Sequence, residues 1–309
     1  MKKFSLKSLL TIACLLCSIS IYAQKFEVDG IYYNIKSEDE VEVTQPSYNE
    51  SAEGYRYFGS IEIPEKVTYS DITYNVTSIG NFAFSGCYDL IKVVIPNSVT
   101  KIGYYAFNTT GLTEVVIPNS VTLIDEGAFY CCFELRDLTI SNGVASIGAF
   151  AFYQCNSLTE ITIPNSVTEI GQSAFHLCER ATVLTLGNRV NKIGMYAFGD
   201  CNNIKTVNCY AQEPPSIYDN TFYMSENDNI TLHVQEGCKE AYEKADYWNR
   251  FFKIYEDLTY TAVEDITCDN IDTPIEYYDL NGRRVVEPRK GIYIVKQGST
   301  VKKVVLLGK

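Results

Sequence analysis

The sequence predicts a β-rich solenoid, in which copies of a 22–23-residue unit stack their strands in parallel. Three observations predict this fold. An Ala-Phe pair recurs six times at spacings of 22 or 23 residues, and an Ile-Gly pair precedes five of the six copies. After each Ala-Phe pair, apolar positions alternate as in a strand with one buried face. Because 23 residues cannot bury a core alone, the copies must stack on one another.

The chain begins with a segment typical of export. Three lysines stand among the first seven residues, and residues 9–21 form an apolar stretch that suits a signal peptide and is short for a membrane span. Ala23 is a suitable last residue before cleavage, so we assign residues 1–23 to a signal peptide. Cys14 and Cys17 raise a lipoprotein as the alternative, although the residues before each fit a lipidation site poorly.

Residues 24–75 are expected to form an N-terminal β cap. The segment is rich in tyrosine and in strand-forming residues, with turns near Asp29-Gly30 and around residues 47–54. Ile61–Pro64 resembles a degenerate first copy of the repeat. An open array needs such a segment because the edges of its first coil would otherwise stay uncovered.

Each repeat unit has a predictable internal plan. The main strand ends at a proline in three copies, because proline removes a donor from the ladder. The Val-Thr-x-Ile segment that follows is a second short strand, and the glycine after it permits a bend. The Ala-Phe pair then fills the interior. We therefore expect one internal ladder of phenylalanines: Phe84, Phe107, Phe129, Phe152, Phe175 and Phe198.

A cysteine stands three residues after the phenylalanine in five of the six units. Stacked cysteines invite a redox or metal interpretation, but a buried column of small apolar thiols explains them more simply. Nine cysteines remain after signal cleavage, an odd number that cannot pair completely within one chain. The members of the expected column are Cys87, Cys132, Cys155, Cys178 and Cys201.

The solenoid is expected to span residues 76–257 and to end in a helical C-terminal cap. Ile230–Val234 is one more strand, and Trp248 is expected in the core of the cap and not on a ligand platform. Apolar residues then follow helical spacing: Cys238, Ala241, Tyr242, Ala245, Trp248 and Phe252.

Residues 258–309 are expected to form a small β domain of their own. Short strands are predicted at Ile275–Leu280, Arg284–Val286, Ile292–Lys296 and Thr300–Leu307. Asn281-Gly282 favours a tight hairpin turn between the first two strands.

Composition and motifs exclude several classes of function. The formal charge is −12, or −15 without the signal peptide, which argues against binding nucleic acid or an anionic membrane. The chain has two histidines, and neither has a sequence neighbour that would form a metal pair or a nucleophile–base pair. We expect no catalytic residue, no metal and no cofactor.

The candidate ligand-binding residues lie in the slots where the copies differ. A mildly acidic column on the main strands contains Glu114, Asp137 and Glu160, and a parallel column from Val94 to Asn208 suits ordinary strand surface. Exposed aromatic side chains suit contacts with proteins or glycans, although packing between neighbouring coils would explain them equally. An edge that follows the Ile-Gly bend carries the remaining candidates: Tyr104, Tyr105, Phe150, Met195 and Tyr196.

The repeat resembles one family closely. The pattern IPNSVTxIGxxAFxxCxxLxxV stands almost whole from Ile163 onward, and the resemblance to the BspA-like leucine-rich repeat proteins covers Tyr74 to Ile254. The resemblance implies a curved leucine-rich-repeat solenoid on a bacterial surface, and some members are associated with adhesion. The tail, with Tyr278–Val285, resembles the C-terminal sorting domains of the type IX secretion route in Bacteroidetes, which implies passage across an outer membrane. The alternative is a small β-module packed at the end of the solenoid.

The sequence thus predicts a non-catalytic, adhesin-like interaction protein, secreted or held at the outer cell surface. Its expected partner is a host or microbial surface protein. A glycan-binding module and a structural protein of the cell envelope are the alternatives. An enzyme is the least favoured, and converging carboxylates or histidines in a pocket would be its sign.

Overall fold

The computed structural model describes residues 25–46, 57–223 and 229–258, together with the backbone of four strands between residues 276 and 306. The chain divides into two compact units, Met1–Leu258 and Thr259–Lys309, and each is described by itself. The expected signal peptide lies outside the described residues.

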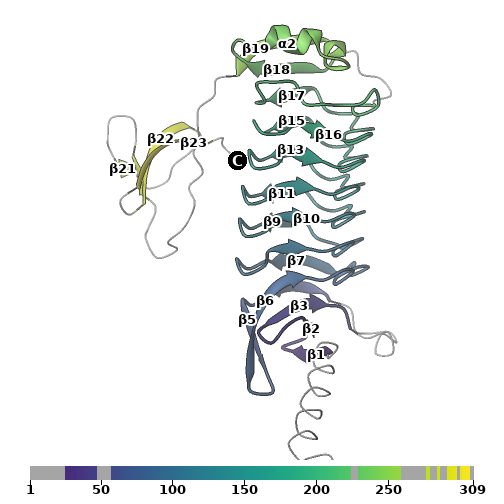
Figure 1. The fold of residues 1–309 in the computed structure, drawn as a ribbon, viewed down its shortest axis with the longest axis vertical. Helices are drawn as coiled ribbons and strands as arrows, with labels where there is room; N and C mark the ends of the chain where they lie inside the picture. The colour runs from purple at the N-terminus through teal and green to yellow at the C-terminus, as the bar shows by residue number, and fades with distance from the viewer. Residues whose placement is uncertain are drawn as a thin grey trace, which may run out of the picture. The chain divides into compact units, whose positions relative to one another are not determined.

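The first unit is a β-solenoid of stacked parallel coils, which confirms the predicted fold (Figure 1). The main strands pair in parallel with equivalent residues opposite each other, as Leu138 lies opposite Val115. They belong to two hydrogen-bonded sheets, ordered β11-β9-β7-β4 and β13-β15-β17-β18-β19. The strands of the six units are β7 (Leu90–Val94), β9 (Glu114–Ile117), β11 (Asp137–Ile140), β13 (Glu160–Ile163), β15 (Val183–Leu186) and β17 (Thr206–Cys209).

The predicted second strand of each unit is also present, but it is only two residues long. These strands pair in parallel and continue a ten-stranded sheet that begins in the N-terminal cap. In each, the isoleucine points into the core and its neighbour points out. They are β8 (Lys101–Ile102), β10 (Leu123–Ile124), β12 (Ser146–Ile147), β14 (Glu169–Ile170) and β16 (Lys192–Ile193).

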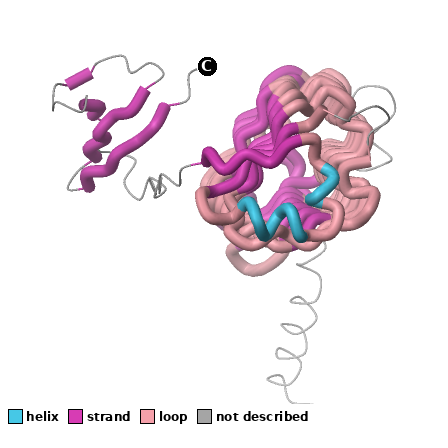
Figure 2. The backbone as a smooth tube through the Cα atoms, turned by 90° about the horizontal axis from the view of Figure 1, so that it is seen from above, coloured by secondary structure: helices cyan, strands magenta, loops and turns pink. Residues whose placement is uncertain are grey.

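The rest of each coil is loop, drawn in pink between the stacked strands in Figure 2. These loops form a hydrogen-bonded ladder of their own. In one unit the N–H groups of Tyr105, Phe107 and Thr109 donate to carbonyls of the next coil at 3.0, 2.7 and 2.7 Å. Tyr105 and Thr109 have φ of +50° and +56°, and the residues before the alanine and two after the phenylalanine are left-handed in every unit. Each of these residues other than glycine costs about 1–2 kcal/mol, so the loop ladder depends on its bonds to the neighbouring coils.

A continuous phenylalanine ladder fills the interior, as the sequence predicts. Phe107, Phe129 and Phe152 are fully buried, and their ring centroids lie 5.0 and 5.1 Å apart with planes within 7°. Tyr57 closes the ladder at one end, 4.6 Å from Phe84. Burial of such rings is the largest single source of stability in each coil.

The N-terminal cap continues the ten-stranded sheet with an antiparallel meander. Its strands β1 (Lys25–Val28), β2 (Ile31–Ile35) and β3 (Glu40–Thr44) lead to β6 (Ile72–Ile79), which forms a hairpin with β5 (Lys66–Tyr69). The predicted degenerate repeat is present as β4 (Gly59–Glu62), paired in parallel with β7.

The C-terminal cap adds two parallel strands, β18 (Thr231–Gln235) and β19 (Lys253–Leu258), to the last main strand. Between them lie helix α2 (Lys239–Lys244) and a single 3-10 turn, η3 (Trp248–Arg250). Trp248 is buried at the end of the phenylalanine ladder, against Phe222, and its Nε1 donates to the Pro215 carbonyl at 2.8 Å. Its expected place in the cap core is therefore confirmed.

The expected helix through Phe252 is wrong beyond Lys244. Ala245 has an extended backbone, with ψ of 136°, and Tyr247 is left-handed, with φ of 68°, so the helix cannot continue. Beyond Lys244 the residues therefore no longer follow helical spacing. Phe252 is exposed, and Phe251 packs on Phe222 and Trp248 in its place.

The second unit contains a four-stranded antiparallel sheet in the order β21-β20-β22-β23. The strands are β20 (Glu276–Tyr278), β21 (Arg284–Val285), β22 (Gly291–Gln297) and β23 (Thr300–Leu306), close to the predicted ranges. β20 pairs antiparallel with β21, as a hairpin would require. The predicted turn at Asn281-Gly282 lies outside the described residues.

Removing one ring from the middle of the ladder should destabilise the whole solenoid. Phe152→Ala deletes a fully buried ring between two stacked neighbours, so we expect a loss of about 3–5 kcal/mol in the free energy of unfolding. Urea unfolding followed by circular dichroism measures it. Phe133→Ala is the control, because Phe133 is exposed. Equal losses for the two variants would contradict a buried ladder.

Candidate functional site

An acidic column lies on the outer face of the main strands. Glu114 and Asp137 stand directly opposite each other in the parallel register, and Glu160 takes the same position in β13. All three side chains are exposed. Like charges on adjacent strands destabilise a sheet by about 0.2–1 kcal/mol per pair. Lys92 Nζ forms an ion pair with Glu114 Oε1 at 2.5 Å, which reduces the repulsion between carboxylates at one end of the column only.

An apolar patch lies beside the N-terminal end of this column. Val94 and Val116 are 44 % and 59 % exposed on the outer face of β7 and β9. Ile91 is 51 % exposed, because β7 has an irregular register against β4 that leaves Ile91 without an opposite residue. No residue type signals this bulge, since Leu90 and Ile91 are equally apolar. The apolar patch therefore consists of Ile91, Val94 and Val116.

The predicted aromatic edge divides into two columns, because neighbouring residues of one loop point in different directions. Tyr105, Phe150 and Tyr196 share the left-handed slot before the alanine, with φ of 50–56°. Tyr104 and Met195 occupy the slot before it, and both are exposed. The structure brings Tyr104 and Tyr105 together, with ring centroids 4.5 Å apart, and places Met195 elsewhere, beside Gln172.

Further rings join the column of Tyr105, Phe150 and Tyr196 into one continuous contact series. Tyr130 lies 5.4 Å from Tyr105 and stacks on Tyr153 at 4.7 Å. The sequence analysis missed these two tyrosines, although they share the slot after the Ala-Phe pair and recur after 23 residues. The remaining members are Phe82, His176 and Tyr223.

These rings contact one another in several geometries. Tyr130 and Tyr153 stack with an interplanar angle of 5°, and Tyr104 contacts both Phe82 and Tyr105. Burial raises the pKa of the Tyr105 and Tyr130 hydroxyls, so both stay neutral. The edge offers packed aromatic rings and neutral hydroxyl groups, which suit protein contact.

The five cysteines of the predicted column are buried. The thiols of Cys132, Cys155 and Cys201 donate to phenylalanine carbonyls of the preceding coil at 3.1–3.3 Å. Burial raises the pKa of the Cys155 and Cys178 thiols well above the ordinary value, and a neighbouring thiol adds to the shift. Thiols in this state are poor nucleophiles and poor metal ligands. Their arrangement supports a structural role.

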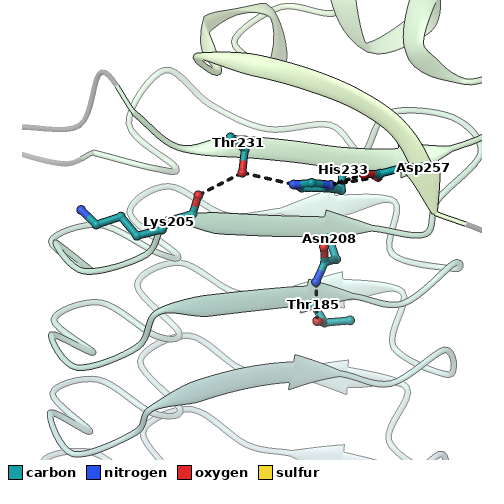
Figure 3. A network of polar contacts seen from close by, with 6 residues as sticks. All are labelled: Thr185, Lys205, Asn208, Thr231, His233 and Asp257. Atoms are coloured by element: carbon teal, nitrogen blue, oxygen red, sulfur yellow. Dashed lines mark hydrogen bonds and ion pairs between the residues drawn. The ribbon is translucent and has the colours of Figure 1, made fainter. Parts of the chain in front are cut away.

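Both histidines pair with an aspartate of a neighbouring coil. His176 Nε2 lies 2.9 Å from Asp200 Oδ2 within the series of aromatic contacts. His233 Nδ1 lies 2.8 Å from Asp257 Oδ1, and its Nε2 lies 3.2 Å from Thr231 Oγ1 (Figure 3). Thr231, His233 and Asp257 thus follow the order of the nucleophile, the base and the orienting acid in a catalytic triad.

Two observations favour a structural role for the network around His233, in which it joins neighbouring strands. The Thr231 hydroxyl donates to the Lys205 carbonyl at 3.2 Å, so its proton is held by the backbone (Figure 3). The His233 ring stacks on Tyr255 at 5.0 Å. These contacts tie β18 to the strands on both sides of it. Among the described residues, no three or more His, Cys, Asp or Glu side chains converge as a metal site requires.

Comparison with known families decides the identity of the repeat. A family model described as BspA type leucine rich repeat region matches residues 63–181 and 168–260, with six copies. The chain belongs to the BspA-type leucine-rich repeat family. This BspA-type chain has no significantly similar curated protein. No helix in the described part of the chain has the length and hydrophobicity to cross a bilayer.

Solved structures of leucine-rich repeat proteins are similar to the chain. One from Bacteroides ovatus is 19 % identical, with 75 % of this chain and 76 % of that chain covered and a TM-score of 0.39. A leucine rich cell surface protein from Faecalibacterium prausnitzii is 22 % identical, with coverage of 75 % and 72 % and a TM-score of 0.48. A pneumococcal vaccine antigen is 13 % identical, with coverage of 78 % and 100 % and a TM-score of 0.42.

Thiol reactivity tests the structural role of the cysteine column. In the folded protein at pH 8, iodoacetamide should modify the partly exposed Cys238 and leave Cys155 and Cys178 unmodified, because burial excludes the reagent and raises the pKa of both thiols. In urea all of them should react. Mass spectrometry of the peptides measures each site. Fast modification of Cys155 in the native protein would show that the thiols do not form a closed column.

Proposed function

We propose that this protein is an exported, non-catalytic interaction protein of the bacterial outer surface, with an adhesin-like role. Its partner is a host or microbial surface protein that binds the outer face of β7, β9, β11 and β13. The observation that carries the proposal is the acidic column, Glu114, Asp137 and Glu160, beside the exposed apolar patch of Ile91, Val94 and Val116.

The acidic and apolar side chains on this face indicate which side chains its partner should present. Apolar residues surrounded by charge are typical of the centre and rim of a protein interface. Carboxylates kept adjacent at a cost in stability are explained by a ligand that neutralises them. The partner segment should therefore combine lysine or arginine with apolar side chains. The mature chain's charge of −15 would speed the approach of such a segment at low salt.

The aromatic edge supports the same function as a second contact surface. Tyr104, Met195 and Tyr196 are each about two-fifths exposed. The alternative is that Tyr104 and Tyr105, which pack against each other, stack on sugars. A structural role in the cell envelope is the other alternative, and it predicts no saturable ligand.

Both ends of the chain support export. Residues 1–23 have the basic and apolar regions of a signal peptide. The four-stranded sheet between residues 276 and 306 belongs to a unit separate from the solenoid, as a sorting domain would be. The proposal is that this unit directs passage across the outer membrane.

Neutralising the acidic column should weaken binding without harming the fold. We expect the double variant Asp137→Asn with Glu160→Gln to bind its partner more slowly and with less dependence on salt. Its free energy of unfolding should stay equal or rise by about 0.2–1 kcal/mol, because like charges are removed. Surface plasmon resonance on immobilised matrix proteins and mucins measures binding, and urea unfolding measures stability.

The matched control is Glu38→Gln with Asp71→Asn, since both residues are exposed on the N-terminal cap. It removes the same charge and should leave specific binding unchanged. If both double variants bound equally weakly, net charge alone would explain the loss of binding. No saturable binding by the unmodified protein to any surface would refute the adhesin-like role.

Deleting the second unit should abolish surface display. The chain truncated after Leu258 keeps the compact first unit, so it should still fold and be exported through its signal peptide. We expect it to accumulate inside the outer membrane, whereas the full chain is digested by protease added to intact cells. Cell fractionation with immunoblotting checks this. Equal digestion of both forms would refute the sorting role of residues 259–309.

A further inference from the structure

A hollow of about 310 Å³ lies on the outer face of the two-residue strands β12, β14 and β16. It is formed by different strands from the face proposed above, and none of the candidate residues except Met195 lines it. Its volume is at the lower end of the range of small-ligand sites. The side chains at its wall come from Ser146, Glu169, Gln172, Lys192, Met195 and Tyr218.

Three glycines in successive coils line the hollow. A Cβ on Gly148, Gly171 or Gly194 would lie 2.5–2.7 Å from backbone atoms of the preceding coil. Adjacent backbones therefore approach so closely at these positions that only glycine fits. One coil earlier the glycine is replaced by Asp125, which pairs with Lys101 at 2.9 Å. The hollow is thus confined to the C-terminal coils.

The charged groups of the hollow balance each other. Glu169 Oε2 and Lys192 Nζ lie 3.8 Å apart, and their side chains are 56 % and 54 % exposed. A carboxylate that accepts, an ammonium that donates and the Gln172 amide, which does both, face the same space. With no excess of either charge, the site favours a neutral ligand. Hydroxyl groups match it because each can donate and accept.

Tyr218 provides an open ring at the margin of this polar wall. It is 44 % exposed, and no ring in the described part of the chain packs against it, unlike the rings of the aromatic edge. Its position is fixed through the backbone, since the Tyr218 N–H donates to Thr221 Oγ1 at 2.8 Å. Thr221 is fully buried, and its hydroxyl donates to the Gly194 carbonyl at 3.2 Å. The backbone that carries the ring is therefore anchored to the coil of Gly194 before any ligand arrives.

We propose that this hollow binds a neutral saccharide. One pyranose ring stacks its C–H face on Tyr218 and Met195, and its hydroxyl groups bond to Glu169, Gln172 and Lys192. This combination of an open aromatic face with paired donors and acceptors distinguishes the hollow from the acidic column. The inference adds a second class of ligand to the protein partner and does not depend on that partner.

The test uses four neutral probes: maltotetraose, cellotetraose, mannotetraose and N,N′,N″,N‴-tetraacetylchitotetraose. Each is titrated into the mature full chain by isothermal calorimetry, with ligand-observed NMR for weak binding. We expect saturable binding of at least one probe. Tyr218→Ala should weaken it by about tenfold, and Glu169→Gln should weaken it because one ionised acceptor is lost.

The matched controls are Phe133→Ala and Glu179→Gln, both exposed residues that do not line the hollow. Neither should change the affinity for the probe, and all four variants should keep the melting temperature. Asp137→Asn should also leave saccharide binding unchanged, so the two proposals fail separately. Absence of saturable binding by every probe, or equal affinity in Tyr218→Ala, would overturn the proposal.

Discussion

The structure depends on one constraint, which is that each coil can satisfy its side chains and backbone only against the coils above and below. Phe107, Phe129 and Phe152 bury their faces on one another, and the loop N–H groups donate across coils as regularly as those of the strands. The left-handed residues in those loops are unfavourable alone. Stacking compensates for this cost by completing a hydrogen-bonded ladder, and the two end caps protect the terminal coils.

The sequence predicted the repeating interior because its residues recur at a fixed period. The Ala-Phe pairs, the cysteine column, both strands of each coil and the cap position of Trp248 follow from periodicity and residue type. It could not predict the left-handed loop ladder, because Tyr105, Thr109 and Gln154 carry no glycine signal for it. The bulge at Ile91 and the helix end at Lys244 depend on contacts with neighbouring strands, which a single sequence does not reveal.

The candidate surfaces are predictable only in part, for a related reason. Period and register place Glu114 and Asp137 on one face, since equivalent residues of a parallel stack must align. The contacts of the aromatic edge depend on the neighbours that each coil supplies, so Tyr104 packs on Tyr105 whereas Met195, in the equivalent slot, lines the hollow. The hollow beside Tyr218 is lined by residues of three successive coils and of the segment after the last repeat, and no local motif in the sequence signals that combination. Positions that build the stack are thus distinct from those available to a ligand.

Hydrogen exchange measured by NMR tests most directly whether adjacent coils are hydrogen-bonded through their loops as well as through their strands. The amides of Thr109, Gln154 and Leu177 lie in loops, yet each donates to the next coil at 2.7–2.9 Å. They should exchange as slowly as the amides of Val115 and Ile161 in the main strands, because opening either requires separating two coils. Exchange of the loop amides at the rate of unprotected loops, with the strand amides still protected, would contradict an interlocked stack.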